Sequence, residues 1–335
     1  MSTFRTVLHP TDFSRRADYA FQLACSFARD RGARLIVLHA AEPPMTAYGG
    51  VMTPPPPPQE YRREAEEQLR QFQAPGAEVR IERRLEEGAP AEEILRVAKE
   101  VNCDLIVMGT HGRTGLGRLL MGSVAEQVVR KAPCPVVTVK APHEETPESI
   151  TPAGAEGRFS RLPIGAILHP TDLSDHSSYT LQLACSLARD QGARLIVLHV
   201  AVPPMVAYGE ALVEIASEDS RETLEEKLSH LVRPEDARVR VEYHTVHQGD
   251  PAQEVCRFAQ ESNCDLIVMG THGRTGLGRL LMGSVAERVV RQAPCPVLTA
   301  KLPPAEARPS SESRPEESGQ ALEDSVRGAF TTPQA

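Results

Sequence analysis

The sequence predicts an α/β protein of two tandem domains, each built around a doubly wound parallel sheet. The chain has 335 residues, and a single domain usually holds ~100–200. The segment from Asn102 to Glu126 returns letter for letter from Asn263 to Glu287. Within each copy short apolar runs alternate with helical segments, which is typical of parallel sheets with right-handed crossovers.

The two copies also align near their starts, where HPTDFS from His9 corresponds to HPTDLS from His169. We therefore expect a first domain over residues 1–140 and a second over residues 163–302. Residues 141–162 are rich in Pro, Glu, Gly, Ser and Thr and are predicted to be a linker. Residues 303–335 have the composition of a disordered tail, because they hold too little apolar surface to offset the entropy of ordering.

The first half of each copy is predicted to run strand, helix, strand. In copy one, Thr6 to His9 and Leu35 to Ala41 have the composition of buried parallel strands. Ser14 is expected to cap the helix between them, and Gly32 to end it in the left-handed conformation. The proline run from Pro54 to Pro58 predicts a stiff, solvated crossover loop, with a polyproline recognition segment as the alternative.

The second half continues the alternation. Pro90 suits the first turn of a helix that reaches about Val101, and copy two begins the same helix with Asp250 and Pro251, an N-cap followed by proline. The other predicted elements are a charged helix from Glu60 to Phe72, strands from Glu78 to Leu85, Leu105 to Met108 and Pro135 to Val139, and a helix from Ser123 to Lys131.

The composition excludes several classes of protein. A net charge of −8 argues against binding to nucleic acid over the whole surface. The longest apolar runs are far shorter than the ~20 residues of a membrane-spanning helix, and the first residues lack a signal-peptide stretch. We therefore expect a cytoplasmic protein with no membrane contact. Six of the seven cysteines recur as matched pairs without a C-x-x-C motif, which favours buried free thiols.

A glycine-rich loop after the fourth predicted strand is the strongest candidate for a binding site. Gly109 ends the strand, Gly112 follows, and Gly122 stands directly before Ser123 and the next helix. Ligands of doubly wound sheets bind beyond the carboxyl ends of the strands. Glycine lets a ligand touch the backbone, and a helix N-terminus favours anions. The loop therefore predicts a polyphosphate cradle, although its spacing matches neither a P-loop nor a G-x-G-x-x-G turn.

Structural alternatives stand beside several of these residues. Ser123 and Glu126 could form a capping box that satisfies only their own helix. Asp12 could tie down the loop that follows it, and the loop arginines Arg113 and Arg274 could reach phosphate or stay in solvent. Histidines beside strand ends are more often hydrogen-bonded fillers than ligands, so we expect no metal site in the set formed by His9, His39, His111 and their matches.

The pattern Gly-x2-Gly-x9-Gly-Ser after an apolar strand, with Pro-Thr-Asp after the first strand, resembles the ATP-binding class of the universal stress protein family. The resemblance covers both repeats. It implies a five-stranded parallel sheet of order 3-2-1-4-5, with ATP between the first and fourth strands and domain pairing through the fifth strands. Asp12 and the main chain near Ala40 would then hold the adenosine end, and the glycine loop would line the ribose and phosphates.

The nucleotide-binding residues implied by the resemblance, together with the neighbouring loop arginines, form matched sets. In copy one they are Pro10, Thr11, Asp12, Ala40, Met108, Gly109, Gly112, Arg113, Gly122, Ser123 and Val124. In copy two they are Pro170, Thr171, Asp172, Val200, Met269, Gly270, Gly273, Arg274, Gly283, Ser284 and Val285.

The expected function is a stress or signalling module that binds one adenine nucleotide per repeat, with ATP alone or with Mg²⁺ or Mn²⁺. We expect the repeats to dock as an intramolecular pseudo-dimer, because open sheet edges at the fifth strands are a liability. A homodimer and an unidentified protein partner stay open. The alternatives are a slow ATPase or another adenine-nucleotide-dependent enzyme, and a scaffold that uses its acidic tail. An enzyme is disfavoured, because the loop brings no acidic residue to bind a metal or orient water.

Overall fold

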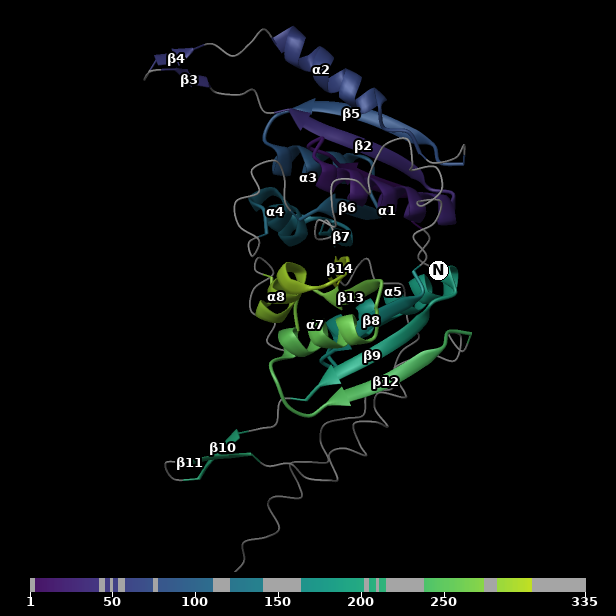
Figure 1. The fold of residues 1–335 in the computed structure, drawn as a ribbon, viewed down its shortest axis with the longest axis vertical. Coiled ribbons are helices and arrows are strands. Elements are labelled where there is room, and N and C mark those ends of the chain that lie inside the picture. Colours follow the sequence, from purple (N-terminus) through teal and green to yellow (C-terminus); the bar gives the residue numbers. More distant parts are fainter. Residues whose placement is uncertain are drawn as a thin grey trace, which may run out of the picture. The chain divides into compact units, whose positions relative to one another are not determined.

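The computed structural model describes most of both repeats (Figure 1). The predicted linker over 141–162, the predicted tail over 303–335 and most of the proline run lie outside the described residues. The described ranges are 4–41, 46–48, 51–53, 58–74, 78–110, 121–140, 164–201, 205–208, 211–214, 238–273 and 282–302.

Within the described residues, the core strands of the first repeat alternate with helices as predicted, and the second repeat follows the same order except over residues 215–237, which lie outside the described residues. The first repeat contains β1 (Thr6–Pro10), α1 (Arg15–Arg31), β2 (Arg34–Ala41), β3 (Thr46–Tyr48), β4 (Val51–Thr53), α2 (Pro58–Arg70), β5 (Ile81–Glu87), α3 (Pro90–Glu100), β6 (Leu105–Gly109), α4 (Ser123–Lys131) and β7 (Val136–Val139). The second contains β8 (Ala166–Thr171), α5 (Asp175–Gln191), β9 (Arg194–Val200), β10 (Met205–Tyr208), β11 (Ala211–Glu214), β12 (Val241–Val246), α7 (Pro251–Glu261), β13 (Leu266–Gly270), α8 (Ser284–Gln292) and β14 (Val297–Ala300).

Both repeats have the strand order expected from the resemblance. The ten-stranded sheet runs β12-β9-β8-β13-β14-β7-β6-β1-β2-β5. Each half therefore places its core strands in the order third, second, first, fourth, fifth. Pairing is parallel within each half, as β1 with β2 and β1 with β6 illustrate. The predicted fold class is confirmed.

The predicted helix ends form as local chemistry dictates. The Ser14 hydroxyl accepts a hydrogen bond from the Ala17 amide and caps α1, and Gly32 ends that helix with φ +59°. In α7 the Asp250 carboxylate accepts from the Gln253 amide, and Pro251 occupies the first helical position. Side-chain oxygens and glycine satisfy the backbone groups that a helix leaves unpaired at its ends.

The structure contains two short hairpins that the sequence analysis did not predict. β3 pairs antiparallel with β4, and β10 pairs antiparallel with β11. They precede α2 in one repeat and follow β9 in the other, where the two copies differ most in sequence. The third strand of the first repeat also begins at Ile81 rather than Glu78, because strand ends in a polar sequence carry little hydrophobic signal.

Helices cover both faces of the sheet. Along β2 the buried side chains alternate, with Leu35 and Val37 packed in one cluster and Ile36 and Leu38 in another. The first cluster includes residues of α1, α2 and α5, and the second includes residues of α3, α4, α7 and α8. Because successive side chains of a strand point to opposite faces, α1 and α4 lie on opposite faces. Aliphatic side chains dominate both layers.

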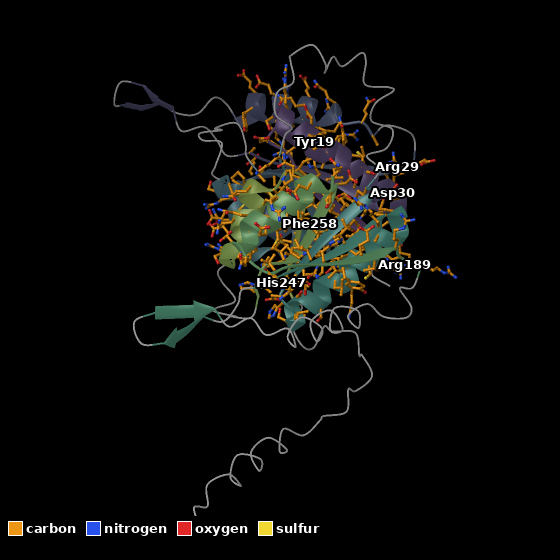
Figure 2. All side chains as sticks on the ribbon, turned by 60° about the horizontal axis from the view of Figure 1, so that its bottom comes forward. Tyr19, Arg29, Asp30, Arg189, His247 and Phe258 are labelled. Carbon is orange, nitrogen blue, oxygen red and sulfur yellow. The ribbon has the colours of Figure 1, made fainter. Side chains whose placement is uncertain are left out.

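The two repeats meet along their fifth strands. β7 pairs antiparallel with β14, with Val137 opposite Leu298. At the ends of α1 and α5, Arg31 forms an ion pair with Asp190, and the side-chain amide of Gln191 donates to the Asp30 carboxylate at 2.8 Å. Figure 2 labels Asp30 on α1 and, on α5, Arg189, which directly precedes Asp190. The described residues of both repeats belong to one compact unit, residues 1–302.

A histidine is buried inside the first strand of each repeat. His9 is fully buried, its Nδ1 donates to the Val107 carbonyl at 2.9 Å, and its ring lies 5.6 Å from that of Phe21. Burial lowers the pKa of His9 to about 4. His169 repeats this arrangement with the Val268 carbonyl, and burial lowers its pKa to about 4 as well. Both rings are hydrogen-bonded core residues and are neutral at pH 7.

These histidines should make the fold sensitive to mild acid. Between pH ~6.5 and ~4 the unfolded imidazole binds a proton that the folded one refuses, so stability falls as the pH falls through that window. From pH 7.5 to pH 5.0 the expected loss of unfolding free energy is about 2 kcal/mol per histidine. Urea unfolding at pH 7.5 and 5.0 should show a smaller loss in a His9→Asn, His169→Asn variant. The exposed His247 provides the control, and equal losses in wild type and double variant would contradict the assignment.

Candidate functional site

The carboxyl ends of β1 and β6 frame a cavity in the first repeat. These strands are adjacent in the sheet, but α1 follows β1 on one face and α4 belongs to the other. The loops after the two strands therefore diverge, as ligand sites of doubly wound sheets require. The cavity measures about 390 Å³. Its lining contains every described residue predicted for this repeat: Pro10, Thr11, Asp12, Ala40, Met108, Gly109, Gly122, Ser123 and Val124.

The second repeat carries the matching cavity between the ends of β8 and β13. It measures about 530 Å³. Both volumes fall in the range of ~300–1,000 Å³ that is usual for small-molecule sites. Its lining again contains every described predicted residue: Pro170, Thr171, Asp172, Val200, Met269, Gly270, Gly273, Gly283, Ser284 and Val285. The predicted Gly112, Arg113 and Arg274 lie outside the described residues.

The turn after β1 fixes Asp12 at the cavity. Phe13 has φ +62°, and its amide donates to the Thr11 hydroxyl at 3.0 Å. The Ser14 hydroxyl donates to Oδ1 of Asp12 at 2.6 Å, so this carboxylate does tie down its loop. Its other oxygen, Oδ2, is buried and accepts no hydrogen bond from the residues that the structure describes. Such a buried acceptor is costly unless a donor reaches it.

The helix after β6 begins inside the cavity. Gly122 is the N-cap of α4, its amide donates to the Thr110 carbonyl at 2.8 Å, and its carbonyl accepts from the Glu126 amide. Ser123 is the first helical residue, it is exposed, and no side-chain cap forms. The capping-box alternative is therefore wrong, because the box needs serine at the N-cap. Gly122, Ser123 and Val124 line the cavity, so an anion that entered it would meet the start of this helix.

Glycine is needed where the backbone closes on this site. A Cβ on Gly273 would lie 2.5 Å from Oδ2 of Asp172, so any side chain there would displace the carboxylate. A Cβ on Gly283 would lie 3.3 Å from the Thr271 carbonyl that its own amide contacts. The Asp172 carboxylate at Gly273 and the Thr271 main chain at Gly283 thus explain two of the glycines that the sequence singled out.

Several lining residues were not among those predicted. Thr110 and Thr271 are buried beside the glycines, and Pro90 and Pro251 start the helices that close one wall. The threonines stand inside the identical segment, so the repeat itself carried that signal. His39 also lines the first cavity, where its Nδ1 donates to the Thr11 carbonyl at 2.8 Å and holds the turn before Asp12.

Comparison with known proteins agrees with this architecture. Universal stress protein MJ0531 of Methanocaldococcus jannaschii is 39% identical over 143 residues, which cover 41% of this chain and 82% of that protein. Universal stress protein E of Photorhabdus laumondii is 28% identical over 223 residues, which cover 63% of this chain and 66% of that one. A solved universal stress protein of Archaeoglobus fulgidus covers 89% of this chain and 98% of its own, with a TM-score of 0.61 at 21% identity.

Within the described residues, no helix is both long and apolar enough to cross a membrane. The model of the Universal stress protein family matches residues 3–140 and again residues 163–301. These matches take in both cavities and the sheet that carries them. The chain belongs to the universal stress protein family.

Proposed function

We propose that each repeat binds one adenine nucleotide, ATP, and that occupancy serves regulation. The observation that carries the proposal is the duplicated cavity at the strand-order switch, with a helix N-terminus and glycine backbone on one wall. Anionic phosphates suit the unpaired amides of such a helix start.

The residues present fit this ligand. The unpartnered Oδ2 of Asp12 suits a hydroxyl or amino donor at the adenosine end, and Leu38, Met108 and Ile94 offer apolar surface for a base. Gly122, Ser123 and Val124 begin the helix that would receive phosphates. We extend the proposal to Gly112, Arg113 and Arg274, which follow the same strands in sequence, and to Mg²⁺ or Mn²⁺ as companions of the phosphates.

Regulation is favoured over catalysis by the choice of side chains. Among the described lining residues Asp12 is the sole acid of the first cavity and Asp172 of the second. Asp12 is already engaged with Ser14, and phosphoryl transfer usually relies on groups that position a metal and a water. A ligand that binds one conformation better than another shifts the population without being consumed. Slow hydrolysis is the second candidate.

We also propose that residues 1–140 and 163–302 act as two domains docked in solution as one intramolecular pair. The antiparallel pairing of β7 with β14 supports this, since it removes two open edges. The buried Arg31, whose side chain is 4% exposed, adds its ion pair with Asp190.

Two nucleotide sites per chain are the first expected outcome. Micromolar binding needs about −8 kcal/mol, and charged hydrogen bonds supply ~1.5–3 kcal/mol each before ordering costs. Titration calorimetry with ATP should give a stoichiometry of two. Gly122→Val should remove only the first site and Gly283→Val only the second, because a β-branched side chain would fill the space beside the helix start. A stoichiometry of one or none in the wild type would contradict the proposal.

ATP turnover should be slow. Hydrolysis measured with Mg²⁺ or Mn²⁺ should fall well below the ordinary enzymatic range of ~1–1,000 per second. The Asp12→Ala, Asp172→Ala variant should lose nucleotide affinity more than any residual turnover per bound nucleotide. Wild-type turnover within the ordinary range would favour the enzyme.

Charge reversal tests the docking. Arg31→Glu should lower the melting temperature, because it places a carboxylate against Asp190 and leaves buried charge unpaired. Adding Asp190→Arg should restore part of the loss. Small-angle scattering of the wild type should fit one docked pair, and two independently tumbling lobes would refute it.

A further inference from the structure

Two lysines cross from one repeat to the other. Lys140 directly follows β7, and its Nζ donates to the Ala293 carbonyl at 3.4 Å, where α8 ends. Lys301 directly follows β14, and its Nζ donates to the carbonyls of Arg130 and, at 3.2 Å, Ala132, where α4 ends. Each lysine therefore caps the last helix of the opposite repeat.

The chemistry at these helix ends explains the contacts. A helix leaves its last carbonyls unpaired and carries partial negative charge there, which a lysine ammonium stabilises. Both helices end at alanine rather than at a glycine in the left-handed conformation, so a glycine cap does not compete. Burial lowers the pKa of both lysines, and the carbonyls replace part of the water that each ammonium has lost.

The residue before each lysine hydrogen-bonds to a threonine that lines a cavity. The Val139 carbonyl, next to Lys140, accepts from the Thr110 amide at 3.0 Å, and the Thr110 carbonyl accepts from Gly122, the N-cap of α4. In the second repeat the Ala300 carbonyl accepts from Thr271 at 3.0 Å, and the Thr271 carbonyl accepts from Gly283 at 2.8 Å.

These contacts close into a ring. From Gly122 it follows α4 to its end, crosses to Lys301, returns through Thr271 to Gly283, follows α8 to its end and crosses back through Lys140. Each helix has nine residues, or about 13 Å at 1.5 Å per residue. Each helix thus begins at one cavity and ends on a lysine whose preceding residue hydrogen-bonds to a lining threonine of the other cavity.

We propose that the two sites are coupled, so that a ligand in one raises the affinity of the other, and that Lys140 and Lys301 carry the coupling as positioning residues. This rests on the proposed function, because it needs ligands at both cavities. An anion at the start of α4 orders that helix, its end and the strand behind Lys301. The second ligand then meets a helix start that is already ordered and spends less entropy on binding.

Calorimetry on the full chain measures the coupling. Gly283→Val and Gly122→Val give the intrinsic association constants of the first and second sites with ATP. The product of the two stepwise constants of the wild type, divided by the product of the intrinsic ones, is the coupling factor. We expect about fivefold or more, the lower end of typical allosteric coupling.

Lysine variants test whether Lys140 and Lys301 carry the coupling between the two sites. Lys140→Met and Lys301→Met keep an unbranched apolar stem and remove the ammonium, so the coupling factor should fall towards one while both single-site constants hold. Lys301→Arg, which keeps a charged donor, should retain part of it. Lys131→Met is the matched control, because Lys131 lies exposed in the last turn of α4. A wild-type factor of one, or an unchanged factor in both methionine variants, overturns the proposal.

Hydrogen exchange tests the connection without nucleotide and separates it from the proposed function. Lys140→Met should raise amide exchange along α8 as far as Glu287 and Gly283, about fivefold over wild type, and Lys131→Met should leave α8 unchanged. An increase confined to residues 290–293 overturns the coupling even if nucleotide binds. Absence of any ATP binding would refute the proposed function, and the exchange result would then decide whether the helices connect the two cavities.

Discussion

Right-handed crossovers send the chain from β1 into α1 on one face of the sheet and from β6 into α4 on the other. Because the two strands are neighbours, the loops that leave them must separate, and the space between the loops is the cavity. The turn at Phe13 follows β1, the buried Thr110 follows β6, and Gly122 begins α4, so all three belong to the segments that separate here. The site is thus a consequence of topology, and its side chains refine a space that the backbone already opens.

The duplication shows which parts of that arrangement tolerate change. The segment that supplies β6, its loop and the start of α4 is identical in both copies, and main chain packs against main chain there. The helix starts nearby differ, since Asp250 caps α7 and pairs with Arg288, whereas α3 begins after Ala89 without a side-chain cap. Close packing limits which side chains fit at glycines such as Gly283, whereas the loss of an N-cap side chain costs only about 1 kcal/mol.

The junction between the repeats has departed from twofold symmetry. Arg31 faces Asp190, but the matching position across the junction holds Gln191, which meets Asp30 by a neutral donor. In a symmetric dimer both contacts would have to be the same. Fusion of the two copies removes that requirement, so each side of the junction can change alone. The pairing of β7 with β14 remains symmetric, and so do the contacts of Lys140 and Lys301 with the opposite repeat.

The sequence by itself determined the fold class, the caps of α1 and α7, and about half of the residues that line the cavities. Apolar runs specify buried strands, Ser14 and Gly32 carry the end signals of α1 in their own chemistry, and the identical glycine segments mark the loops after β6 and β13. These features are local or repeated, so the order of residues records them. The hairpin β3–β4 escaped prediction, because two three-residue strands are too short to show a period.

Only the tertiary structure decided which residues meet across the fold. Thr110 reaches Gly122 and Val139, and Lys301 reaches Ala132 from the opposite repeat, although no spacing in the sequence links these positions. It also decided that Ser123 is the first helical residue and no cap. Such contacts depend on how strands order themselves and how helices end against one another. The local sequence around each residue does not record these contacts, because the partners lie far apart in the chain and meet only when distant segments pack together.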